Sequence, residues 1–286
     1  MNSSSIKLIE CPRDAMQGWK NFIPTEKKIE YINSLLKVGF DTIDFGSFVS
    51  AKAIPQMVDT KEVIGNLDLG ISNTKLLAIV ANLRGAEEAS VFDQITYLGF
   101  PFSVSETFQQ RNTNSSIDES LKRVEEIQNL CINKNKKLVI YISMAFGNPY
   151  GDLYDEDIVF NWVEKLVELD IEIISLADTV GVASPEQVYD MTSYLVESLP
   201  STEIGVHLHS TFENWKQKLD AAVKAGCTRF DGALKGIGGC PMANDDLVGN
   251  MNTEWMLNYF EKNNIATSLN KEALAESLRI AGEIFI

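Results

Sequence analysis

Short apolar runs rich in β-branched residues alternate with longer amphipathic stretches along most of the chain. Runs of this kind, bounded by polar residues and turn formers, are typical of buried strands. We expect eight of them to be strands, at residues 6–10, 41–45, 75–80, 93–98, 137–143, 171–176, 204–209 and 228–234.

Helical patterns separate several of these runs, at residues 24–39, 116–133, 155–170, 184–199 and 214–226. In each, apolar residues recur at spacings of three or four, which predicts a helix with one face on a core. Alternating strands and helices indicate a parallel sheet with right-handed crossovers, and eight units are the number that closes a barrel.

The pattern therefore predicts an α/β fold, a (β/α)8 TIM barrel that forms a single domain over residues 1–286, with extra helices at its carboxyl end. An open, doubly wound sheet is the main alternative. It is less favoured because no GxGxxG motif follows the first predicted strand.

Reactive side chains gather where the predicted strands end, which is the end of a barrel that carries chemistry. They are Arg13, Asp14, Asp44, Asp178 and the two histidines of the seventh run. A single aspartate near a strand end is more often a turn or helix-cap residue. Several of them at one barrel mouth favour a functional site.

His207 and His209 are the only histidines of the chain, and one residue separates them. Side chains two apart on a strand share a face, which in a barrel is the interior. Two imidazoles at one depth suggest a metal site, with Asp14 as a plausible oxygen ligand. Nitrogen and oxygen donors favour an ion of the magnesium, manganese or zinc group. In the alternative interpretation, one histidine belongs to a hydrogen-bond network and the other faces the helices.

The four cysteines form no CxxC pair and no closely spaced framework, which indicates thiols in a reducing cytoplasm. Cys240 follows a glycine-rich stretch after the eighth run, and it is a better catalytic candidate than Cys131 or Cys227. Cys11, beside Arg13, is ambiguous.

Composition excludes two classes of partner. The net charge of −15 opposes the attraction that drives nucleic-acid binding. No apolar run approaches the roughly 20 residues that span a bilayer. We therefore expect neither a nucleic-acid nor a membrane partner.

Six motifs together resemble the 3-hydroxy-3-methylglutaryl-CoA lyases of the DRE-TIM metallolyase superfamily, over nearly the whole chain. They are PRDAMQ (12–17), SFVSAKAIPQM (47–57), RNTNSSI (111–117), SLADTVGVASP (175–185), VHLHSTF (206–212) and GIGGCP (236–241).

The resemblance implies that Asp14, His207, His209 and Asn250 hold a divalent cation, Mg²⁺ or Mn²⁺. It also implies that Arg13, Asp178 and His207 are catalytic, and that Cys240 lies on a loop that closes over the substrate. Asp44 stands where the family has a catalytic glutamate. Lys20, Lys52, Arg111 and Lys235 are candidate cations for coenzyme A phosphates.

The reaction implied is the retro-Claisen cleavage of an acyl-CoA substrate, 3-hydroxy-3-methylglutaryl-CoA, to acetoacetate and acetyl-CoA. Asp178 and a histidine both remain candidates for the base. Two other functions remain open: an aldolase or Claisen-type enzyme on a related hydroxyacyl substrate, and a catalytically silent metal-binding relative. We also expect a homo-oligomer, a dimer.

Overall fold

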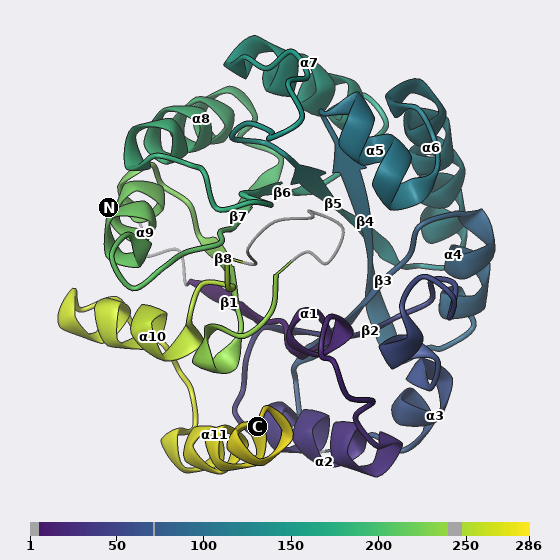
Figure 1. Ribbon diagram of the computed structural model, residues 1–286, viewed down its shortest axis with the longest axis vertical. Helices are drawn as coiled ribbons and strands as arrows, with labels where there is room; N and C mark the ends of the chain where they lie inside the picture. The colour runs from purple at the N-terminus through teal and green to yellow at the C-terminus, as the bar shows by residue number, and fades with distance from the viewer. Residues whose placement is uncertain (1–5, 71, 240–247) are drawn as a thin grey trace.

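The computed structural model describes residues 6–70, 72–239 and 248–286. Its strands form a closed parallel barrel in chain order, which confirms the predicted fold class (Figure 1). The strands are β1 (Lys7–Glu10), β2 (Thr42–Ser47), β3 (Lys75–Ile79), β4 (Ile95–Ser103), β5 (Lys137–Ser143), β6 (Ile173–Ala177), β7 (Glu203–His207) and β8 (Arg229–Gly232). Each of the eight predicted runs overlaps one of them.

Helices surround the barrel (Figure 1). They are α1 (Pro12–Gln17), α2 (Thr25–Leu36), α3 (Thr60–Gly65), α4 (Leu83–Ser90), α5 (Glu106–Thr113), α6 (Ile117–Asn133), α7 (Glu156–Val167), α8 (Pro185–Ser198), α9 (Trp215–Lys224), α10 (Thr253–Lys262) and α11 (Lys271–Ile284), with 3-10 turns η1 (Pro55–Met57) and η2 (Leu234–Gly236). The five predicted helices correspond to α2, α6, α7, α8 and α9.

Local sequence explains where several helices begin. Ser116 accepts a hydrogen bond from the backbone N–H of Glu119, whose side chain accepts from the N–H of Ser116. Ser184 and Gln187 form the same reciprocal cap at the start of α8. Such caps satisfy N–H groups that have no partner within the helix, so they fix the point at which each helix leaves its loop.

The core has two parts because successive strand residues face opposite sides. Most buried apolar side chains, such as Leu98 and Ile140, pack between the strands and the helices. Their neighbours along the strands, such as Val139 and Tyr141, fill the barrel interior. This alternation also decides which polar residues point inward.

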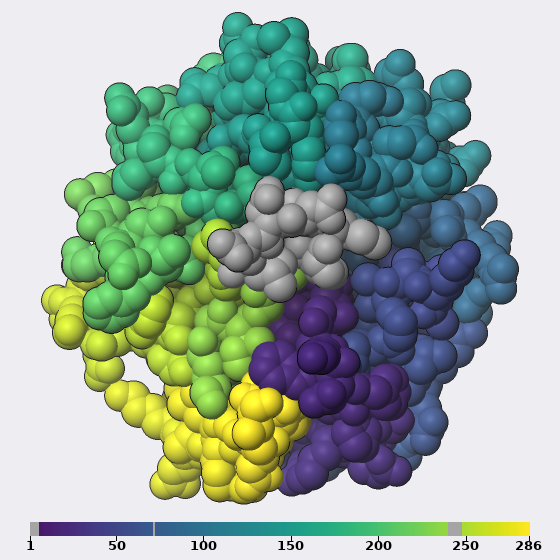
Figure 2. Space-filling model, viewed as in Figure 1, coloured from purple at the N-terminus to yellow at the C-terminus, as the bar shows by residue number. Residues whose placement is uncertain are grey.

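The last two helices extend the regular barrel, as the sequence predicts. The segment that follows α11 packs beside the first long helix: the ring of Phe285 lies 5.2 Å from Trp19 and 6.1 Å from Tyr31, centroid to centroid. In Figure 2 the purple region of α1 and α2 and the yellow carboxyl-terminal region lie side by side on one face. Among the described residues, no helix is long and apolar enough to cross a membrane.

Candidate metal centre and active site

A cavity of about 440 Å³ opens at the carboxyl ends of the strands. Arg13 and Asp14 contribute to its wall from α1, directly after β1, and Tyr141 contributes from β5. His207 and His209 line it from the end of β7. The short turn after β1 and the end of β7 therefore bring together residues almost two hundred positions apart.

Asp14, His207 and His209 form a compact group of potential metal ligands. One donor atom from each residue lies within 4.8 Å of the others, and all three side chains are buried. Strand β7 ends at His207, but His209 continues the extended backbone through an isolated bridge to Asn250. The two imidazoles therefore share one face, with ring centroids 5.3 Å apart.

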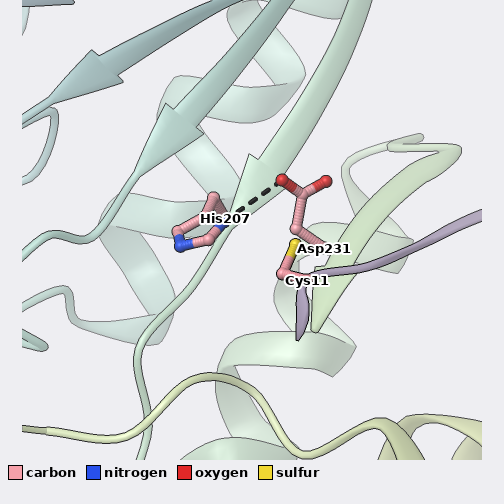
Figure 3. A group of neighbouring side chains, drawn as sticks. All are labelled: Cys11, His207 and Asp231. Atoms are coloured by element: carbon pink, nitrogen blue, oxygen red, sulfur yellow. Dashed lines mark hydrogen bonds and ion pairs between the residues drawn. The ribbon is translucent and has the colours of Figure 1, made fainter. Parts of the chain in front are cut away.

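Hydrogen bonds orient both imidazoles in the same way. Nδ1 of His207 lies 3.1 Å from Oδ2 of Asp231 on β8, and the dashed line in Figure 3 joins them. Nδ1 of His209 lies 2.8 Å from the carbonyl oxygen of Val248. Both partners are acceptors, so each Nδ1 carries the proton and each Nε2 keeps a lone pair for a cation.

Asn250 adds a fourth donor to this group. Its Nδ2 donates to Oδ2 of Asp14 at 2.7 Å and to the carbonyl of Ile237 at 2.9 Å. Its buried Oδ1 has no hydrogen-bond partner among the described residues. An amide oxygen left in this state beside a carboxylate and two imidazoles fits a divalent cation, since such an ion supplies the missing partner.

Gly238 allows Asn250 to come this close. Its φ of +116° lies where side chains are rarely tolerated, and a Cβ there would stand 2.3 Å from Nδ2 of Asn250. The same Cβ would lie 3.1 Å from Oδ2 of Asp14. Glycine at this position is therefore part of the site.

The charges of the group suit a cation. Burial opposes ionisation of Asp14, but Arg13, His207 and His209 outweigh it and lower the pKa of Asp14 to about 2. Burial also lowers the pKa of His209, and the neighbouring His207 lowers it further. Asp14 and His209 therefore favour the carboxylate and the neutral imidazole, the forms that bind metal ions, whereas Asp231 and Asp14 outweigh burial and raise the pKa of His207.

Arg13 is clamped between two aspartates. Its Nη1 donates to Oδ1 of Asp14 at 2.9 Å, and its Nη2 donates to Oδ2 of Asp44 at 2.5 Å. The guanidinium is thus held on the cavity wall in one orientation. Asp44 contacts the guanidinium but does not itself line the cavity: it is not among the described residues of the cavity wall. Burial raises the pKa of Asp44 to about 6, although Arg13 opposes the shift.

Asp178, which the resemblance implies is catalytic, is paired with a buried lysine and does not face the cavity. Its Oδ2 accepts from Nζ of Lys218 on α9 at 2.6 Å, and its Oδ1 accepts from the N–H of Ala183 at 3.0 Å. Both charged side chains are buried. Asp178 is absent from the described residues that line the cavity, whereas its neighbours Ala177 and Thr179 are present.

The other expected site residues divide into three groups. Cys240 lies outside the described residues. Arg111 lines the cavity from α5, with its guanidinium carbon 4.5 Å from the ring centre of Tyr150. Lys20, Lys52 and Lys235 are exposed and do not belong to the described cavity wall.

Sequence reasoning missed two buried charged residues that contact the predicted site residues, Asp231 beside His207 and Lys218 beside Asp178. Asp231 was placed only in a strand, although a carboxylate in the middle of a barrel strand is itself a sign of an interior polar group. Lys218 was placed only in an amphipathic helix. It stands one turn from Trp215, with Leu219 beside it on the buried side of α9. A lysine there signals a buried partner.

Fold and site together define a class: a (β/α)8 barrel whose strand ends hold a carboxylate and two imidazoles suited to a divalent cation. The comparisons agree. The chain belongs to the HMGL-like family, whose model matches residues 6–280. This confirms the resemblance found in the sequence motifs.

Relatives of known name cover most of this chain. The hydroxymethylglutaryl-CoA lyase of Bacillus subtilis is 33% identical over 271 residues, which cover 94% of this chain and 89% of the relative. A cytoplasmic 3-hydroxy-3-methylglutaryl-CoA lyase of Rattus norvegicus is 34% identical, over 88% of this chain and 74% of the relative.

Solved structures give the same result. An HMG-CoA lyase from Acinetobacter baumannii, in complex with coenzyme A and 3-methylmalate, superposes with a TM-score of 0.92 at 32% identity. The match covers 100% of this chain and 92% of that one. Family, relatives and structure place the chain among carbon–carbon lyases.

Proposed function

We propose that the chain is a divalent-metal-dependent lyase that cleaves 3-hydroxy-3-methylglutaryl-CoA to acetoacetate and acetyl-CoA. The observation that carries this proposal is the convergence of Asp14, His207 and His209 on one cavity, beside Arg13, in a member of the HMGL-like family. The names of its relatives supply the substrate.

Asp14, His207, His209 and Asn250 would hold the cation, Mg²⁺ or Mn²⁺. When bound, such an ion polarises a substrate hydroxyl and lowers its pKa. The residues themselves orient it: the carboxylate of Asp14 is fixed by Arg13 and by Gln17, whose Nε2 donates to Oδ1 at 2.7 Å. Fixed ligands need no rearrangement when the substrate arrives.

Cleavage begins when the tertiary hydroxyl loses its proton. Asp178 and a histidine both stay candidates to accept it: the imidazoles line the cavity but would give their Nε2 lone pairs to the cation, and the carboxylate of Asp178 faces Lys218. The bond between the hydroxyl-bearing carbon and the methylene beside the thioester then breaks, which leaves acetoacetate and a thioester enolate.

Arg13 would stabilise the oxyanion of that enolate, since its guanidinium is already held on the cavity wall. Protonation of the enolate carbon gives acetyl-CoA, and Cys240 remains our candidate for this step. Arg111 is the cation at the cavity best suited to a coenzyme A phosphate. A cytoplasmic location and a homodimer stay predictions.

The test is to incubate the purified, metal-free chain with 3-hydroxy-3-methylglutaryl-CoA, with and without Mg²⁺ or Mn²⁺, and to measure acetoacetate. We expect product only with metal, and loss of both metal binding and product in His207→Ala. A chain that binds the metal fully but forms no product would refute the proposal and favour a silent relative. Unchanged metal binding in His207→Ala would refute the ligand assignment.

A further inference from the structure

Cys11, His207 and Asp231 form a second group of potential metal ligands, next to the first. One donor atom from each lies within 4.8 Å of the others, and all three side chains are buried. Cys11 directly follows β1, His207 ends β7 and Asp231 lies on β8 (Figure 3). Both groups contain His207, so a single imidazole joins them.

Two potential ligand atoms of this second group are not engaged in normal hydrogen bonds. Oδ1 of Asp231 is buried and has no hydrogen-bond partner among the described residues. Within the described part of the chain, the thiol of Cys11 makes only a long contact, 3.9 Å, to the carbonyl of Ile9. A buried carboxylate oxygen without a partner is costly, and a cation is one group that would satisfy it.

The surrounding charge favours a cation over further anions. Burial raises the pKa of the Cys11 thiol, and Asp231, Asp44 and Asp14 raise it further, with only Arg13 acting against them. A second guanidinium, that of Arg229, also lies near Asp231: its Nη1 donates to Glu203 at 3.2 Å, and its buried Nε and Nη2 have no hydrogen-bond partner among the described residues. A divalent ion held by one thiolate, one carboxylate and one neutral imidazole would be electrically balanced.

We propose that Cys11, His207 and Asp231 form a site for a thiophilic divalent ion of the zinc group, and that this ion competes with the cation of the neighbouring site. Sulfur, nitrogen and oxygen donors are the set that zinc accepts, whereas magnesium and manganese prefer oxygen donors.

Competition follows from proton balance at His207. With the ring proton on Nδ1, 3.1 Å from Oδ2 of Asp231, its Nε2 is left for the cavity cation. An ion in the second site takes Nδ1, so the ring proton moves to Nε2 and the thiol proton of Cys11 is released to solvent. A neutral imidazole has one lone pair, so His207 serves one ion at a time.

The site itself does not depend on catalysis, although its competitive effect rests on the cation site of the proposed function. Cadmium is the probe, because a cadmium–thiolate bond gives an ultraviolet charge-transfer band without any substrate. We expect this band when Cd²⁺ is added to the full-length, metal-free chain. Cys11→Ser and Cys11→Ala should remove it.

Two variants serve as matched controls. Cys131→Ser removes another buried thiol, on α6, and Cys240→Ser removes the thiol expected near the substrate. Both should keep the band. A band that survives in both Cys11 variants, or cadmium bound to the parent without a band, would overturn the site.

Competition is measured separately, by electron paramagnetic resonance of bound Mn²⁺. In the parent, Cd²⁺ should release Mn²⁺ at a concentration at least about tenfold lower than in Cys11→Ser, the scale on which ligand-shell changes act. Equal release in both would refute the shared use of His207. Neither measurement uses lyase activity, so an inactive enzyme would count against the proposed function and not against this site.

Discussion

The ion pair of Lys218 and Asp178 gives the sharpest prediction, because it is fully enclosed. Nζ of Lys218 donates to Oδ2 of Asp178 at 2.6 Å, to the carbonyl of His209 at 2.9 Å and to that of Gly181 at 3.0 Å. An ammonium has three protons, so each has an acceptor. The side chains of the pair are 1% and 0% exposed.

We expect Lys218→Met to be strongly destabilising. It leaves the Asp178 carboxylate buried without its counter-charge, and removal of one partner from a buried pair costs about 3–5 kcal/mol. At about 2 °C per kcal/mol for a chain of this size, the melting temperature should fall by roughly 6–10 °C. Urea unfolding followed by circular dichroism measures the free energy, and a thermal scan measures the shift.

A matched control lies on the same helix. Lys224 pairs with Asp220 at 2.7 Å, but its side chain is 66% exposed, so Lys224→Met should change stability very little. Lys218→Met that unfolds no more easily than this control would refute the reasoning.

The double variant Lys218→Met/Asp178→Asn removes both charges and should recover much of the loss. If Asp178 transfers a proton in catalysis, the double variant regains stability without activity.

Three further predictions concern the site and its support. Asp231→Asn should weaken Mn²⁺ binding about ten- to hundredfold, because the carboxylate that fixes the His207 tautomer is lost. Calorimetric titration measures the affinity for Mn²⁺. An unchanged affinity would exclude Asp231 as the residue that orients His207. Gly238→Ala should weaken Mn²⁺ binding, because its Cβ would lie 2.3 Å from Nδ2 of Asn250. The control Gly151→Ala should not, since that residue also has a positive φ (+76°) but nothing lies within 4 Å of its added Cβ. Equal effects of the two variants would point to backbone strain alone. Burial raises the pKa of Glu10 from 4.5 to about 8, so its stabilising contribution is complete below pH 4.5 and is lost as pH rises through 8. Glu10→Gln should flatten this decline in urea unfolding at a series of pH values, and an identical pH profile would contradict the assignment.

The barrel was predictable because its signal is repeated. Each strand reads as an apolar run, each helix as an amphipathic stretch, and eight repeats leave few ways to close a sheet. The histidine pair was predictable for a related reason. Alternation along an extended chain needs only local geometry, and the bridge between His209 and Asn250 keeps the backbone extended past the end of β7.

The direction of the Asp178 side chain could not be predicted from the sequence. Its position after β6 correctly suggested the carboxyl end of the barrel, but the direction of its side chain depends on a lysine forty positions later. That lysine reaches it only because α9 packs with this face against the barrel, which is a tertiary contact. The charged partner of a buried side chain cannot be read from local pattern, and Asp231 was missed for the same reason.

Asp44 was predicted as a site residue, but its contact with Arg13 is a tertiary feature that only the structure shows. Its side chain is one methylene shorter than the glutamate that the resemblance leads one to expect, yet its Oδ2 still reaches Nη2 of Arg13 at 2.5 Å. The shorter side chain is sufficient because Asp44 is buried behind Arg13 and touches the guanidinium rather than the cavity. Its length therefore bears on the chemistry through the orientation of Arg13. Arg13 in turn donates to Asp14, so the carboxylates of β2 and α1 hold one guanidinium between them.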